Sequence, residues 1–199
     1  IGDWLPGVGG SGGSVLDANG VAPTNGFTFH IIDPYDGDDN KFGGGDKVNH
    51  DPNTWGWTIN GVLGKDNINN VLLHLTKDAA GHWWAIIAAD RQKDEGTSYI
   101  DFEFLQNTLT TFLTDPNDTN KGGFLSTGPH CGRTTNDFLL TIPLSNGGNV
   151  PNFFFQKWVY TGDTHACGGF DYVDSTNSTP VYAAVNTKDI TNLPFAAFG

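Results

Sequence analysis

Basic residues are scarce in this sequence. Of its 199 residues, only 10 are lysine or arginine, against 22 aspartate or glutamate, so the formal net charge is −12. A chain this acidic is repelled by the phosphates of nucleic acids and by anionic membranes, which argues against both as partners. The acidity suits a protein that is soluble outside the cell and that binds Ca²⁺. The plainer interpretation, that the charge serves solubility alone, stays open.

Long apolar runs are also missing. No stretch approaches the roughly 18–20 consecutive apolar residues that a membrane-spanning helix needs, so we expect no membrane insertion. The sequence contains no methionine and shows no signal peptide. We therefore expect a trimmed, exported chain, extracellular or on the cell surface, and the length of the native gene product stays open.

The chain has only two cysteines, Cys131 and Cys167. No Cys-x-x-Cys spacing is present, which argues against zinc held by cysteine. In an exported protein we expect the pair to form a disulfide, which would stabilise the fold by about 2–4 kcal/mol. Two free buried thiols would give the same sequence.

What the sequence has in plenty is glycine and aromatic residues. Gly numbers 27, aromatic residues make up 13% and charged residues only 16%. This composition favours short strands joined by tight turns. We expect about eight strands: 27–32, 54–59, 70–78, 81–91, 98–113 with a bend near Asn107, 137–144, 152–160 and 181–187. The predicted fold is all-β, an antiparallel β-sandwich of jelly-roll type, with a Gly-rich N-terminal arm over 1–26 and one domain over 27–199.

Strand 98–106, SYIDFEFLQ, carries two carboxylates two residues apart, Asp101 and Glu103. Side chains alternate along a strand, so Tyr99 shares their face. The opposite face is apolar and is expected to turn to the core: Ile100, Phe102 and Phe104. The spacing of roughly 6.5–7 Å is compatible with the paired acids of a glycoside hydrolase. The alternatives are solvated carboxylates, a Ca²⁺ site, or carboxylates that bind a basic side chain.

The run YIDFEFL resembles the strand motif of family 16 glycoside hydrolases and plant xyloglucan-active enzymes, which are jelly rolls. Their pattern is Glu-Ile-Asp-Phe-Glu-Phe-Leu. Asp101 and Glu103 match its Asp and second Glu, but Tyr99 stands where the family has its nucleophile. The resemblance therefore implies a shared strand pattern, and the family's mechanism lacks its nucleophile here.

A wider series of motifs covers about half of the chain. It comprises Trp55 and Trp57, KDNI at 65–68, ADR at 89–91, FEFLQ at 102–106 and the stretch 136–159. In this order the motifs resemble a concanavalin-like β-sandwich domain of large secreted bacterial surface proteins. That resemblance implies a secreted, surface-associated location and a β-sandwich fold.

A calcium site is predicted from DGDDN, which places Asp36, Asp38 and Asn40 at alternating positions. Lys41 and Lys47 stand where an EF-hand needs Gly and Glu, so an EF-hand is excluded. A looser Ca²⁺ site that also uses Asp46 remains, with a solvated acidic loop as the alternative.

Aromatic side chains beside carboxylates and amides suit carbohydrate binding. The candidate ligand-binding residues are Trp55, Trp57, Trp84, Tyr99, Asp101, Glu103 and Arg91. For each tryptophan the alternative is packing in the core, and for Arg91 and Glu103 it is a structural ion-pair network with Asp90.

The leading hypothesis is a non-catalytic extracellular surface module for glycan binding or adhesion, with Ca²⁺ as a stabilising ion and a glycan or cell-surface polysaccharide as partner. The second is a structural subunit of a surface layer or extracellular fibre, in which the N-terminal arm docks on a neighbouring copy. The third is a glycan-active jelly-roll enzyme that uses Asp101 and Glu103.

Overall fold

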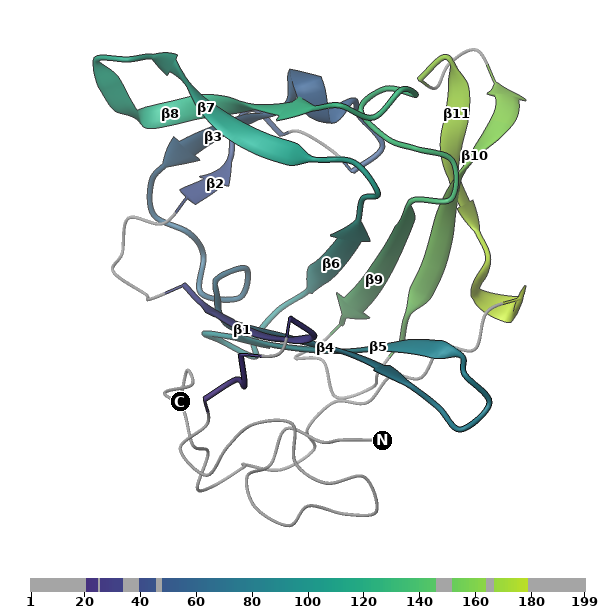
Figure 1. The fold of residues 1–199 in the computed structure, drawn as a ribbon. Coiled ribbons are helices and arrows are strands. Elements are labelled where there is room, and N and C mark those ends of the chain that lie inside the picture. The colour runs from purple at the N-terminus through teal and green to yellow at the C-terminus, as the bar shows by residue number, and fades with distance from the viewer. Residues whose placement is uncertain are drawn as a thin grey trace. The chain divides into compact units, whose positions relative to one another are not determined.

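The structure is a computed structural model, and it describes residues 21–24, 26–33, 40–45, 48–145, 152–163 and 167–178. These residues form eleven strands and two short 3₁₀ turns, with no α-helix among them (Figure 1). The all-β prediction is confirmed. Among the described residues, no helical segment has the length and apolar character that a membrane crossing requires.

The chain divides into two compact units, and the first contains a three-stranded antiparallel sheet. Its strands, in the order β1-β4-β5, are β1 (Thr28–Ile32), β4 (Ile68–Lys77) and β5 (Trp83–Arg91). The predicted hairpin between the last two is present. Asp78 closes its turn, because its carboxylate accepts hydrogen bonds from the backbone N–H groups of Ala80 and His82, both at 2.9 Å.

The second unit contains two four-stranded antiparallel sheets. Sheet I, in the order β11-β10-β9-β6, consists of β6 (Ser98–Phe104), β9 (Phe138–Leu144), β10 (Phe154–Asp163) and β11 (Gly169–Asp174). Sheet II, in the order β2-β3-β8-β7, consists of β2 (Asn40–Phe42), β3 (Gly56–Ile59), β7 (Leu109–Asp115) and β8 (Asp118–Ser126). In Figure 1, sheet II runs from blue to teal and sheet I from teal to yellow.

Aromatic side chains fill the core of the second unit. Leu139, Trp158 and Tyr172 of sheet I are buried and form one apolar cluster. Trp55, which directly precedes β3 of sheet II, is also buried. The arrangement is that of an antiparallel β-sandwich, as the sequence predicts, and it is compatible with a jelly roll.

The predicted strands correspond to β1, β3–β7, β9 and β10, and the bend near Asn107 separates β6 of sheet I from β7 of sheet II. Three strands were not predicted: β2, β8 and β11. β8 is rich in Gly and polar residues and is defined by its pairing with β3 and β7, a context that local propensity does not contain. The predicted strand 181–187 and most of the predicted arm 1–26 lie outside the described residues. The single domain over 27–199 stays a prediction.

Gly122 lies in the centre of sheet II, where β8 pairs with Trp57 of β3 on one side and with Leu113 of β7 on the other. A Cβ atom at this position would collide with the backbone oxygen of Phe112 and would lie 2.5 Å from the Trp57 ring. The missing side chain therefore lets the Trp57 indole lie against the strand.

We expect Gly122→Ala to destabilise the protein by about 3 kcal/mol, because a collision with backbone cannot be relieved by a rotamer change. Gly56→Ala is the matched control in the same sheet, since its Cβ would meet its nearest neighbour at an ordinary 3.6 Å. Urea unfolding of both variants measures the difference. Equal midpoints for the two variants would contradict the tight packing at Gly122.

Candidate ligand-binding cleft

The loop between β8 and β9 folds back on itself in a tight turn. His130 and Arg133 exchange two backbone hydrogen bonds, of 2.8 and 3.2 Å, across Cys131 and Gly132. Both central residues have positive φ, 50° for Cys131 and 71° for Gly132, as a type I′ turn requires. The turn thereby fixes the backbone from which the Arg133 side chain starts.

The base of this loop is held by the carboxylate of Asp137, which is fully buried. It accepts hydrogen bonds from the Thr134 N–H at 2.7 Å and from the Gln106 N–H at 2.9 Å. The Gln106 side-chain amide donates to the same carboxylate at 3.0 Å. The loop is therefore tied to the segment that follows β6, and the buried charge of Asp137 is solvated by fixed donors.

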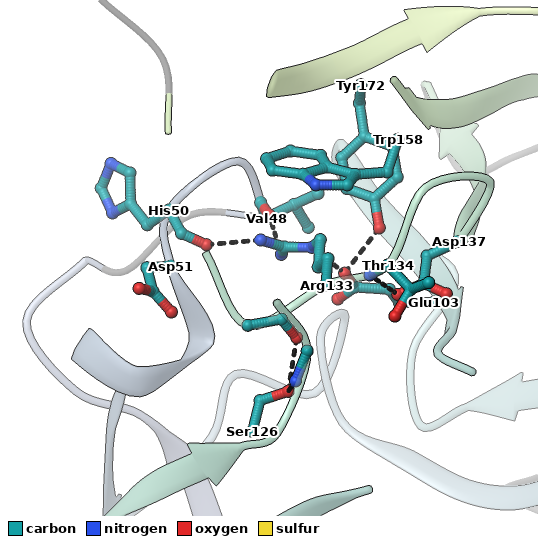
Figure 2. Close-up of polar contacts among 12 residues, drawn as sticks. Val48, His50, Asp51, Glu103, Ser126, Arg133, Thr134, Asp137, Trp158 and Tyr172 are labelled. Carbon is teal, nitrogen blue, oxygen red and sulfur yellow. Dashed lines mark hydrogen bonds and ion pairs between the residues drawn. The ribbon is translucent and has the colours of Figure 1, made fainter. Parts of the chain in front are cut away.

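Arg133 is completely buried and donates in three directions (Figure 2). Its Nε forms an ion pair with Glu103 of β6, with 2.5 Å between Nε and Oε1. Nη1 donates to the backbone oxygen of His50 at 2.8 Å, and Nη2 donates to that of Val48. A buried charge needs such partners, because its loss of hydration costs several kcal/mol.

Three aromatic rings surround the same guanidinium. Its carbon lies 4.8 Å from the Trp158 ring centroid, 5.2 Å from that of Tyr172 and 5.3 Å from that of Trp55. Trp158 and Tyr172 belong to sheet I, whereas Trp55 precedes β3 of sheet II. The cation therefore connects the two layers of the sandwich through ring faces.

Tyr172 also acts on the carboxylate, since its hydroxyl donates to Oε1 of Glu103 at 2.6 Å. Burial, followed by the negative charge of Glu103, raises the pKa of Tyr172 well above its ordinary value. The phenol therefore stays protonated and remains a donor. Oε1 of Glu103 thus receives both a guanidinium and a phenol.

A half-open cleft of about 770 Å³ lies between the sheets of the second unit, next to this network. Its aromatic lining comes from both layers: Phe42, Trp55, Tyr99, Phe124 and Tyr172. Its polar lining consists of carboxylates and amides: Asn49, Asp101, Glu103, Gln156 and Asp171. Three of the lining residues also contact the Arg133 side chain: Glu103, Tyr172 and Trp55.

Three residues of β6 enter the cleft from one strand face. Tyr99 is 63% exposed, Asp101 is exposed and accepts a 2.6 Å hydrogen bond from the Thr141 hydroxyl, and the Glu103 side chain is only 15% exposed. The predicted alternation is present, but the acidic face turns to the cleft between the layers. The opposite face, which was expected to turn to the core, is only half-buried: Ile100, Phe102 and Phe104. Glu103 binds the basic side chain of Arg133, as one of the alternatives from the sequence predicts.

The remaining predicted ligand-binding residues are distributed over both units. Trp55 lines the cleft, whereas Trp57 packs against Gly122. Trp84 and Arg91 lie on β5 of the first unit, where the Trp84 indole donates to Asp78 at 3.0 Å and Arg91 donates to the Asp94 backbone oxygen at 3.1 Å. Asp90, expected in an ion-pair network, instead accepts hydrogen bonds from Asn69 and Asn70.

The predicted calcium ligands Asp36, Asp38 and Asp46 lie outside the described residues. Asn40 is described; it begins β2 and pairs with Ile59 of β3. Within the described part of the chain, no group of three or more His, Cys, Asp or Glu side chains is placed to hold a metal ion. Calcium binding stays a prediction.

Cys131 and Cys167 are free thiols in the structure, half-buried and packed against the cluster that contains Trp158. Burial and then the neighbouring Cys131 thiol raise the pKa of Cys167 to about 12. The fold therefore brings the two cysteines together, and the predicted disulfide stays a prediction.

Sequence reasoning did not identify Arg133, Tyr172, Asp137 and Gln156. One signal for Arg133 was available, because it is the only charged residue between Lys121 and Asp137 when histidine is neutral. A single cation in such a stretch is suited to a buried ion pair. The partner, 30 residues away along the chain, has no sequence signal.

Comparison with protein-family models, curated proteins and solved structures finds no match for this chain. The geometry and chemistry of the cleft are therefore the observations that bear on its function.

We expect Glu103→Gln to destabilise the protein by about 3–5 kcal/mol, because it leaves the buried Arg133 charge uncompensated. Asp101→Asn, two residues along the same strand, should change stability by less than about 0.5 kcal/mol, since Asp101 is exposed. Denaturant unfolding at neutral pH measures both. Similar losses for the two variants would show that the ion pair does not carry stability.

We expect oxidation to join Cys131 to Cys167 and to stabilise the protein by about 2–4 kcal/mol. Unfolding of the oxidised and reduced chain, with free thiols counted in each, measures the effect. The Cys131→Ser/Cys167→Ser variant is the control and should not respond to reductant. Two titratable thiols after exhaustive oxidation would contradict the bridge.

Proposed function

We propose that this chain is a non-catalytic extracellular module that binds a glycan in the cleft between sheets I and II. The observation that supports this most is the lining of the cleft, in which ring faces stand next to carboxylate and amide side chains. Glycans offer apolar C–H surfaces together with many hydroxyl groups. A concave site with aromatic walls and a few convergent polar groups is complementary to both.

Tyr99 is the residue most available to a ligand. The residue is 63% exposed, although it lines the cleft. The rings of Trp55 and Tyr172 already pack against Arg133, so they shape the cleft without being free to move. Asp101, Asn49 and Gln156 supply acceptors and donors for ligand hydroxyls around these rings.

The same geometry disfavours glycoside hydrolysis by Asp101 and Glu103. An acid catalyst must hold a transferable proton, and the nucleophile of a retaining enzyme must reach the sugar. Glu103 instead pairs with a buried guanidinium and accepts a phenol hydrogen bond. Tyr99 stands where the resembled hydrolase motif has its nucleophile. Binding without turnover is therefore the better supported reading.

Export and calcium belong to the proposal on sequence grounds. The net charge of −12, the cysteine pair and the resemblance to secreted surface domains support an extracellular location. The aspartate-rich stretch that begins at Asp33 supports Ca²⁺ as a stabilising ion. Glycan binding measured with Ca²⁺ and with a chelator separates the ion's contribution from that of the cleft.

We expect the purified chain to bind a subset of a broad glycan array, and Tyr99→Ala to weaken that binding about 5- to 30-fold. This is the effect of removing one aromatic contact worth about 1–2 kcal/mol. Tyr160→Ala is the matched control, because Tyr160 is 67% exposed on β10 but does not line the cleft. Calorimetric titration with a glycan from the array measures both variants.

Absence of binding to any glycan on the array, both with Ca²⁺ and with chelator, would contradict the proposal. It would favour the alternative, a structural subunit that self-associates through the N-terminal arm. Release of reducing sugar by the wild-type chain, abolished in Asp101→Asn, would contradict the non-catalytic reading instead.

A further inference from the structure

The charges of the cleft are one-sided. Three carboxylates line it, those of Asp101, Glu103 and Asp171, and no described lining residue is lysine, arginine or histidine. Arg133, which does not itself line the cleft, forms an ion pair with Glu103. In the described part of the chain, Asp101 and Asp171 form no ion pair, and their carboxylates accept hydrogen bonds only from neutral groups, the Thr141 hydroxyl and the Tyr172 N–H.

Three residues that line the cleft already contact a cation. The Arg133 guanidinium pairs with Glu103 and lies against Trp55 and Tyr172, and these three partners are themselves lining residues. Carboxylate and aromatic ring together form a receptor for a positive charge, through ion pairing and cation–π attraction. A second carboxylate and aromatic ring line the cleft from β6, those of Asp101 and Tyr99, which lie two residues apart.

We propose that the ligand of the cleft is a cationic glycan, a polymer whose sugars carry free protonated amino groups. This inference rests on the proposed glycan-binding function and names the class of sugar. Asp101 and Asp171 pair with ligand ammonium groups, Tyr99 packs against a sugar ring, and Asn49 and Gln156 bond to hydroxyls. The excess of negative charge on the whole chain attracts a polycation and repels uronic-acid and sulfated glycans.

A basic peptide would satisfy the same carboxylates, but other features of the cleft favour a sugar. The amide side chains of Asn49 and Gln156 offer hydrogen bonds to a ligand rich in hydroxyl groups. Tyr99 lines the cleft and is 63% exposed, so its ring offers an apolar face to a sugar ring. A peptide side chain would bring one charge and few hydroxyls.

The test compares three β-1,4-linked oligomers of equal length by calorimetry with the full chain: glucosamine, N-acetylglucosamine and glucose. We expect the glucosamine oligomer to bind at least about tenfold more tightly than the other two, with an advantage that shrinks as salt rises. Asp101→Asn and Asp171→Asn should each lower its affinity about tenfold, the effect of one charge-assisted hydrogen bond. Asp94→Asn, which removes an exposed charge on the first unit, is the matched control and should bind like the wild type.

Each outcome is decisive. Equal or tighter binding of the acetylated or glucose oligomer would overturn the cationic ligand and leave the glycan-binding function standing. Binding of oligolysine, with no binding of any oligomer, would identify a basic-peptide receptor and overturn both. No binding of any probe would overturn the cationic ligand, and the broad glycan array then decides whether the glycan-binding function stands. Equal losses in Asp94→Asn and Asp101→Asn would show that net charge, and not the cleft, drives association.

Discussion

The second unit depends on one buried cation. Arg133 is completely buried, and its charge is met by Glu103, two backbone carbonyl groups and three ring faces. These partners come from β6, β10, β11 and the segment before β3, so the side chain organises both sheets at once. Because an unpaired charge in the interior is costly, each partner is constrained once the guanidinium is in place. The network favours one arrangement of the layers over others.

The same constraint shapes the cleft. Glu103, Trp55 and Tyr172 are held from the Arg133 side, and their other surfaces form part of the cleft lining. A binding site built on such fixed groups loses little conformational entropy when a ligand arrives. Tyr99 and Asp101, at the more exposed part of β6, remain available to the proposed ligand. In the proposed function, one strand therefore carries both a stabilising residue, Glu103, and the ligand contacts of Tyr99 and Asp101.

Asp101 and Glu103 lie only two residues apart, but their carboxylates have different roles in the structure. Asp101 is exposed and bonded to the hydroxyl of Thr141, whereas Glu103 compensates a buried charge. From the sequence they look alike, as an acid pair at a spacing that suits glycosidases. The difference between them comes from Arg133, which lies in a loop 30 residues further along the chain. Long-range electrostatic pairing decides which carboxylate is structural.

The sequence by itself determined the all-β class, most of the strands, the hairpin at Asp78 and the alternation along β6, because these depend on local propensity and period. It also singled out Trp55, Tyr99, Asp101 and Glu103, which the structure brings together at the cleft. Only the tertiary structure decided that Trp84 and Arg91 lie in another unit, that β8 is a strand and that Arg133 pairs with Glu103. Those outcomes depend on which strands pair and which charges meet across the fold, and neither is encoded by neighbouring residues.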